Sequence, residues 1–165
     1  MDFRKIFNYI PEVVKPEEKK LGFNVKLKWT LIILVAFFIL ANISLFGLSS
    51  NALKRFEFLA MILGTQFGSI ISLGVGPIVM ASIILQLLVG SGILGIDTTT
   101  VEGKKFFGGI QKLLILFFII FEALIYVLMQ GLQASPGFKY IVILQLILGG
   151  LAIYYMGELV EKWGF

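Results

Sequence analysis

An unusually long apolar run from Phe56 to Ile96 constrains the possible folds of this chain more than any other feature. As one α-helix it would be roughly 60 Å long, whereas the hydrocarbon core of a bilayer is about 30 Å thick. Glycine permits sharp bends and proline removes a backbone donor, so we expect the helix to break at Gly74, Gly76 and Pro77. Irregular backbone at membrane depth persists only when it is buried in protein or faces a water-filled cavity. The break therefore predicts an internal site or pore.

The composition predicts an all-α polytopic membrane protein. Of the 165 residues 58% are hydrophobic, and the mean hydropathy is +0.97. Cysteine and histidine are absent from the sequence, which excludes disulfides, thiolate or imidazole metal sites and histidine-based catalysis. We expect no metal, no cofactor, no enzymatic activity and no direct binding of nucleic acid.

Residues 1–28 are expected to form a cytoplasmic amphipathic helix followed by a charged linker. Phe3, Ile6, Phe7 and Ile10 share one helical face, and Pro11 ends the pattern. A helix lying in the membrane interface and a frayed polar tail both remain open for this segment.

The membrane domain is expected to cover residues 29–165 and to contain four spans with a short helix between the first two. The spans are predicted at about 29–48, 77–94, 113–129 and 138–156, with a polar loop over 97–111. The short helix begins with the charged residues Lys54, Arg55 and Glu57, so the segment at about 52–67 should not cross the membrane.

The distribution of Lys and Arg predicts the orientation. With the N-terminus inside, eleven of the 14 basic residues are cytoplasmic and three are outside, which fits the positive-inside rule. This count requires the run from Phe56 to Ile96 to cross the membrane only once. The short helix must then enter from the outside and stop, which independently supports a break in the long run.

Glu122 lies near the middle of the third predicted span. A carboxylate at that depth is costly and marks a candidate functional site. A structural carboxyl group, protonated or paired with a neighbouring helix, is an equally good interpretation from the residues alone.

The residues from Leu73 to Leu88, LGVGPIVMASIILQLL, closely resemble the signature of the SecY family of protein-conducting channels. Further matches follow the same order along the chain and their spacing is similar to that of the archaeal branch. They include Lys26–Thr30, Phe56–Phe58, Leu87–Gly92, Gln111–Leu114 and Glu122-Ala123. The resemblance covers nearly the whole chain.

The resemblance also implies that a full member has about ten spans in two inverted halves. Tyr155–Glu158 and Gly164-Phe165 look like the opening of the second family signature, where this sequence ends. We therefore expect a fragment, a split gene product or a truncated chain that lacks the fifth span of its own half.

The resemblance further implies roles for individual residues. Val75 and Val79 would belong to an apolar pore ring, and Met80, Ile83, Ile84, Leu87 and Glu122 to a lateral gate through which signal sequences reach lipid. Met80 departs from the family pattern, which has a hydroxyl residue there, so an apolar contact would replace a hydrogen bond between helices. The plug that seals the pore from outside would comprise Glu57, Phe58, Leu59, Ala60, Met61, Ile62, Leu63, Gly64, Thr65, Gln66 and Phe67.

The implied function is that of the N-terminal part of the pore-forming subunit of a translocation channel in the cytoplasmic membrane. The implied partners are the C-terminal remainder of the channel, a SecE-like clamp subunit, a small third translocon subunit, a ribosome or other motor, signal sequences, nascent chains and lipid. A fragment of a secondary transporter with a discontinuous helix is the main alternative. That alternative requires polar groups at the break, whereas the sequence there is apolar. An accessory membrane scaffold and an intramembrane enzyme are weaker alternatives.

Overall fold

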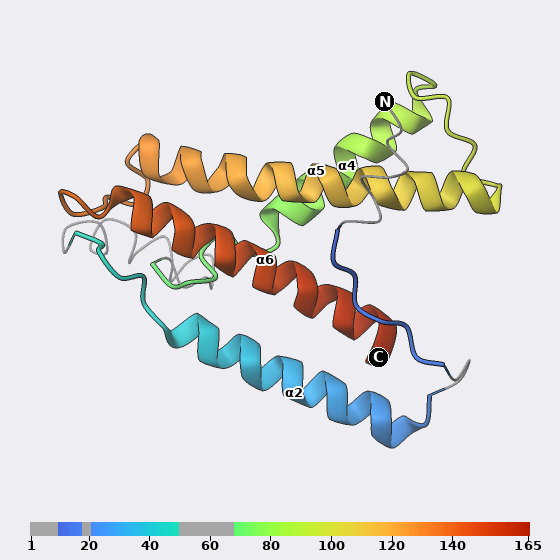
Figure 1. Cartoon of the computed structure of the whole chain (residues 1–165), viewed down its shortest axis with the longest axis horizontal. Helices are drawn as coiled ribbons and strands as arrows, with labels where there is room; N and C mark the ends of the chain where they lie inside the picture. The colour runs from blue at the N-terminus through green and yellow to red at the C-terminus, as the bar shows by residue number, and fades with distance from the viewer. Residues whose placement is uncertain (1–9, 18–20, 50–67) are drawn as a thin grey trace.

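The computed structural model describes residues 10–17, 21–49 and 68–165 (Figure 1). This part of the chain contains four α-helices: α2 at Phe23–Asn42, α4 at Gly76–Gly90, α5 at Val101–Leu128 and α6 at Lys139–Trp163. The prediction of an all-α chain is confirmed. The segments at 1–9 and 50–67, which include most of the predicted interfacial helix and all of the predicted plug segment, lie outside the described residues.

Three of the described helices, α2, α5 and α6, are long and apolar enough to cross a membrane. Helix α4 is apolar but has only 15 residues, so it is about 22 Å long at the usual rise per residue. The fold is therefore that of a membrane protein with one short helix between longer ones.

Helix α5 begins at Val101, well before the span predicted from Leu113. The polar loop expected over 97–111 is wrong from Val101 onward. The Thr100 side chain accepts a hydrogen bond from the Gly103 N–H at 3.0 Å, and Glu102 lies in the first turn. Both features stabilise a helix N-terminus, so a helix starts here despite the polar composition.

Helices α5 and α6 run side by side and hold the main apolar core (Figure 1). From α5 the buried residues recur every four positions, at Ile115, Ile119, Ala123 and Val127. They meet a buried face of α6 that includes Val142, Leu146 and Tyr154. Helix α4 packs on α5, and α2 packs on α6, so the described helices form two pairs joined by α5 and α6.

The described residues between α2 and α4 are held in place by hydrogen bonds near the N-terminal end of α6. Single antiparallel bridges join Ser44 to Ser69 and Leu48 to Ala134. The Gln145 side chain pairs with the backbone of Phe46, accepting from its N–H and donating to its carbonyl, both at 3.0 Å. These contacts provide hydrogen-bond partners for backbone N–H and C=O groups outside the helices. Such groups must be paired within a membrane protein.

Candidate functional site

The candidate site is centred on the start of α4, where the apolar run changes from irregular backbone to helix. Gly74 has a φ of +60°, a conformation that favours glycine, and α4 begins two residues later with Pro77 in its first turn. Before it, the Ser72 hydroxyl accepts from the Gly68 N–H at 2.9 Å and donates to the Ser69 carbonyl at 2.5 Å. The described chain is thus non-helical from Gly68 to Val75, and side-chain hydrogen bonds stabilise it there.

Helix α4 has one buried and one exposed face. Pro77, Ala81 and Leu85 recur every four residues on the buried face, which packs against α5. The exposed face is apolar apart from Gln86 and begins at Val75, which is 60% exposed. It carries five of the six α4 residues predicted for the ring and the gate: Val75, Val79, Met80, Ile83 and Leu87. Ile84 is partly buried beside this face.

Glu122 reaches the first turn of α4 from α5. A Cβ atom placed on Gly76 would lie 3.3 Å from one carboxylate oxygen of Glu122 and 3.4 Å from the other. The carboxyl group therefore covers a position that carries no side chain, directly beside the break. The fold thus brings together two predicted site residues that are far apart in the sequence, one on each helix.

A second polar contact between α4 and α5 was not singled out from the sequence. The Gln111 side chain donates to the Ser82 hydroxyl at 2.9 Å, and that hydroxyl donates to the Ile78 carbonyl at 2.8 Å. Gln111 lies about three turns before Glu122 on α5, and Ser82 lies in the middle of α4. This hydrogen bond therefore joins the two helices within their contact surface and helps to set their relative position.

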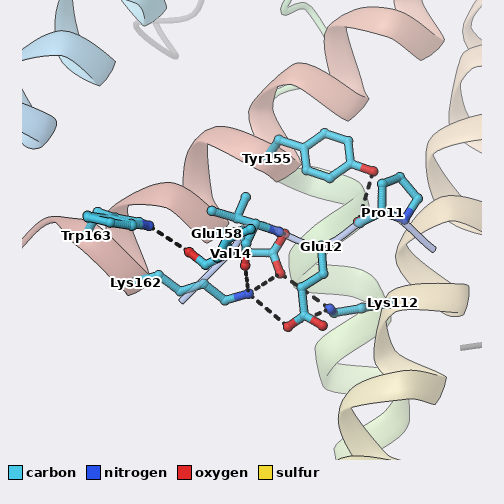
Figure 2. A network of polar contacts seen from close by, with 9 residues as sticks. Pro11, Glu12, Val14, Lys112, Tyr155, Glu158, Lys162 and Trp163 are labelled. Atoms are coloured by element: carbon cyan, nitrogen blue, oxygen red, sulfur yellow. Dashed lines mark hydrogen bonds and ion pairs between the residues drawn. The ribbon is translucent and has the colours of Figure 1, made fainter. Parts of the chain in front are cut away.

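A cluster of four charged side chains lies where α5, α6 and the N-terminal segment meet (Figure 2). Lys162 lies 2.8 Å from Glu12 and 2.9 Å from Glu158, and Lys112 lies 3.1 Å and 3.3 Å from the same two carboxylates. Each lysine therefore contacts both acids. We call Glu12, Lys112, Glu158 and Lys162 the charge cluster.

The acids of the charge cluster differ in exposure. Glu158 is only 8% exposed, and it also accepts a hydrogen bond from the Val13 N–H at 3.3 Å. The Glu12 side chain is 50% exposed. The hydrogen bond from Lys162, together with the charge of Lys112, lowers the pKa of Glu12 below its usual value. Glu12 is therefore a charged carboxylate that can leave the cluster without being buried elsewhere.

Only one of the ion pairs in the charge cluster could be predicted from the sequence. Glu158 and Lys162 are spaced i, i+4, which predicts that they pair on one helical face. Glu12 lies 150 residues before Lys162, so no local pattern connects them. Only the three-dimensional structure shows this contact.

Comparison with known sequence families identifies the chain. A family model described as SecY matches residues 69–165, and one described as the plug domain of Sec61p matches residues 35–68. The second match includes the segment predicted as the plug, while the role of each plug residue stays a prediction.

Curated relatives of the chain carry the description "Protein translocase subunit SecY". The protein from Methanothermobacter thermautotrophicus is 51% identical over 99% of this chain, and that from Methanocaldococcus jannaschii is 40% identical over 96%. The chain covers 36% of each of these relatives, so it spans about a third of their length.

Solved channel structures have the same fold over nearly the whole chain. One, described as "The structure of a protein conducting channel", superposes with a TM-score of 0.84 at 37% identity, covering 99% of this chain and 38% of its own. Another, "Sec61 in the Canine ribosome-channel complex from the endoplasmic reticulum", gives the same TM-score and identity over the same shares of the two chains. The resemblance seen in the sequence is thereby confirmed: the chain belongs to the SecY family.

Proposed function

We propose that this chain supplies the N-terminal part of the pore-forming subunit of a protein translocation channel. The channel would pass unfolded secretory polypeptides across the cytoplasmic membrane and release membrane segments sideways into lipid. The observation that carries the proposal is the exposed apolar face of α4, which starts at a helix break in a chain similar to translocase subunits. With the N-terminus in the cytoplasm, the basic residues follow the positive-inside rule.

Val75 and Val79 are proposed to line the constriction of the pore. They lie one helical turn apart, and the Val79 N–H donates to the Val75 carbonyl at 3.0 Å, so their side chains project in nearly the same direction. Both side chains are exposed in this chain, and they would face the part of the channel that lies outside it. An apolar constriction is hard to wet, so it resists ions but yields to a polypeptide.

Helices α4 and α5 are proposed to form one wall of the lateral gate. Met80, Ile83 and Leu87 leave an exposed apolar surface on α4 that suits contact with a signal sequence or with the opposite wall. Glu122 would act at the end of this wall where α4 begins, beside the break at Gly76. Glu57–Phe67 is proposed as the plug that closes the pore when no chain is present.

The proposed partners follow from the same assignment. They are the remaining part of the channel, a SecE-like clamp subunit, a small third subunit, and a ribosome or another motor that delivers the nascent chain. The chain contains no nucleotide-binding G-x-x-x-x-G-K-[ST] motif, so energy for transport would come from that motor or from folding outside. A solute-binding transporter is not favoured, because the exposed face at the break is apolar.

Conductance of the complete channel tests the pore ring. Replacing both valines, Val75→Gly with Val79→Gly, should widen the constriction and allow ions to leak through the resting channel in planar bilayers. The matched control is Val35→Gly on α2, an equally apolar and exposed valine outside the proposed ring. Conductance that is unchanged in the double variant, or raised equally in the control, would contradict the assignment.

Translocation of substrates with weak signal sequences tests the gate role of Glu122. Glu122→Gln keeps the size of the side chain and replaces its carboxyl group by an amide, so the balance between open and closed gate should shift. The expected result is altered export of weak-signal substrates with little change for strong ones. Equal export of both classes would make Glu122 a structural residue only.

Crosslinking tests the plug, and this chain has no cysteine of its own to interfere. A cysteine at Leu59 and another on the external end of a SecE-like partner should form a disulfide during active transport. If no crosslink forms while substrate is moving through the channel, plug displacement is wrong.

A further inference from the structure

The N-terminal segment Pro11–Val14 lies across the end of α6 without regular secondary structure (Figure 2). Three of its backbone carbonyls accept hydrogen bonds from α6 side chains. Tyr155 donates to the Pro11 carbonyl at 3.3 Å, Lys162 to the Val13 carbonyl at 2.6 Å and Trp163 to the Val14 carbonyl at 2.8 Å. The segment is therefore bound along its length by one helix that lies at the other end of the sequence.

Apolar burial contributes little to this attachment. The Val14 side chain is 77% exposed, and Pro11 and Glu12 are also exposed. Polar contacts thus hold the segment in place, namely the three carbonyl contacts, the Val13 N–H bond to Glu158, and the ion pairs of Glu12. Among these contacts, the ion pairs of the half-exposed Glu12 side chain are the ones that salt weakens.

Glu12 extends the attachment from α6 to α5. Its carboxylate contacts Lys112 on α5 and Lys162 on α6, so the segment connects the two helices through a single side chain. Helix α4 packs on α5 and α2 packs on α6, where the rings of Trp29 and Trp163 lie at an angle with their centroids 5.6 Å apart. The charge cluster therefore lies between the two pairs, where the C-terminal end of α6 meets the middle of α5.

We propose that Pro11–Val14 is a releasable strap that ties the α4–α5 pair to the α2–α6 pair, and that the Glu12 carboxylate closes it. When Glu12 leaves, Lys112 and Glu158 remain as a direct ion pair between the helices, and the strap loses its link to α5. The strap then keeps only its hydrogen bonds to α6. This device lies outside the pore, and its existence does not depend on the proposed function.

Distance measurement between two spin labels tests the strap in the complete channel in lipid nanodiscs. Cysteines are introduced at Lys15, on the strap side, and at Gly157, an exposed position on α6. This chain has no cysteine of its own, and any cysteine elsewhere in the channel is replaced first. A Cβ atom at Gly157 meets no neighbouring atom within 4 Å, so the label should not disturb packing. Pulsed electron resonance should give one narrow distance distribution at low salt.

Glu12→Gln should replace the narrow peak by a broad distribution while the helical circular dichroism signal is unchanged. The matched control is Glu17→Gln, the same chemical change at an exposed position five residues along, which should keep the narrow peak. High salt should broaden the distribution of the unmodified sequence and leave that of Glu12→Gln as it is.

A narrow peak retained in Glu12→Gln, or retained at high salt in the unmodified sequence, would overturn the proposal. Equal broadening in Glu17→Gln would also overturn it, because any lost charge on the segment would then have the same effect. Failure of the strap would leave the pore-ring proposal untouched, since that is measured by ion conductance.

Discussion

The middle and the end of the α5–α6 pair are held together by different chemistry. In the middle, Ile119 and Leu146 are fully buried, and Gly150 leaves just enough space for the Ile119 side chain. At the end, Lys112, Glu158 and Lys162 join with Glu12 in a charge cluster that solvent reaches (Figure 2). Packing in the middle acts at any ionic strength, whereas the charged end responds to salt and acid. The difference indicates a rigid centre with an adjustable end.

The largest expected effect comes from a cavity in the rigid centre. Leu146→Ala should destabilise the chain by about 2–5 kcal/mol, at the low end of that range because lipid is as apolar as the protein core. Reversible unfolding in mixed micelles, followed by circular dichroism, measures it. Leu148→Ala is the control, since Leu148 is exposed on the same helix and should change stability little. Equal losses in both variants would contradict a packed centre.

Overfilling the centre should cost less. A Cβ atom on Gly149 would overlap the carbonyl oxygen of Ile70, so Gly149→Ala must move either α6 or the irregular segment before α4. We expect a loss of about 1–3 kcal/mol in the same unfolding measurement. Gly157→Ala on the same helix meets open space and should be neutral or stabilising by about 0.5–1 kcal/mol. A neutral Gly149→Ala would show that the two backbones are not in close contact.

Removing a lysine from the charged end should have a smaller and salt-dependent effect. Lys162→Met deletes the donor that contacts Glu12, Glu158 and the Val13 carbonyl. We expect a loss of about 0.5–1.5 kcal/mol at low salt, which shrinks as salt is added. Lys139→Met, at the exposed start of α6, is the control and should be nearly neutral. A loss that is the same at low and high salt would remove the distinction between centre and end.

The sequence predicted the parts of the fold that depend on local chemistry. Glycines and Pro77 indicated the break, and the structure has α4 starting at Gly76. The start of α5 was missed, although Thr100 and Glu102 carry the signal of a capped helix N-terminus. The polar composition around Lys104 and Lys105 favoured a loop, but the N-cap at Thr100 stabilises a helix through these residues.

Contacts between distant helices could not be predicted in the same way. The spacing of Val75 and Val79 predicted a shared face on one helix, because helical geometry alone determines it. The approach of Glu122 to Gly76 depends on how α4 crosses α5, and the sequence contains no measure of that crossing. Glu12 likewise meets Lys162 only through the complete fold.

Acid should produce the smallest effect, and it should act at the charged end. The hydrogen bond from Lys162 lowers the pKa of Glu12 below 4.5 in the folded chain. Its contribution to stability is therefore fully present above pH 4.5 and is lost as the pH falls through the lowered pKa. Because the side chain is half exposed and faces Lys112, Lys162 and Glu158, the loss should not exceed about 1 kcal/mol. The free energy of unfolding is measured for the unmodified chain and for Glu12→Gln at pH 6 and at pH 3. The difference in this free energy between the two proteins should be smaller at pH 3. A difference that stays constant would show that the contribution of Glu12 does not come from its charge.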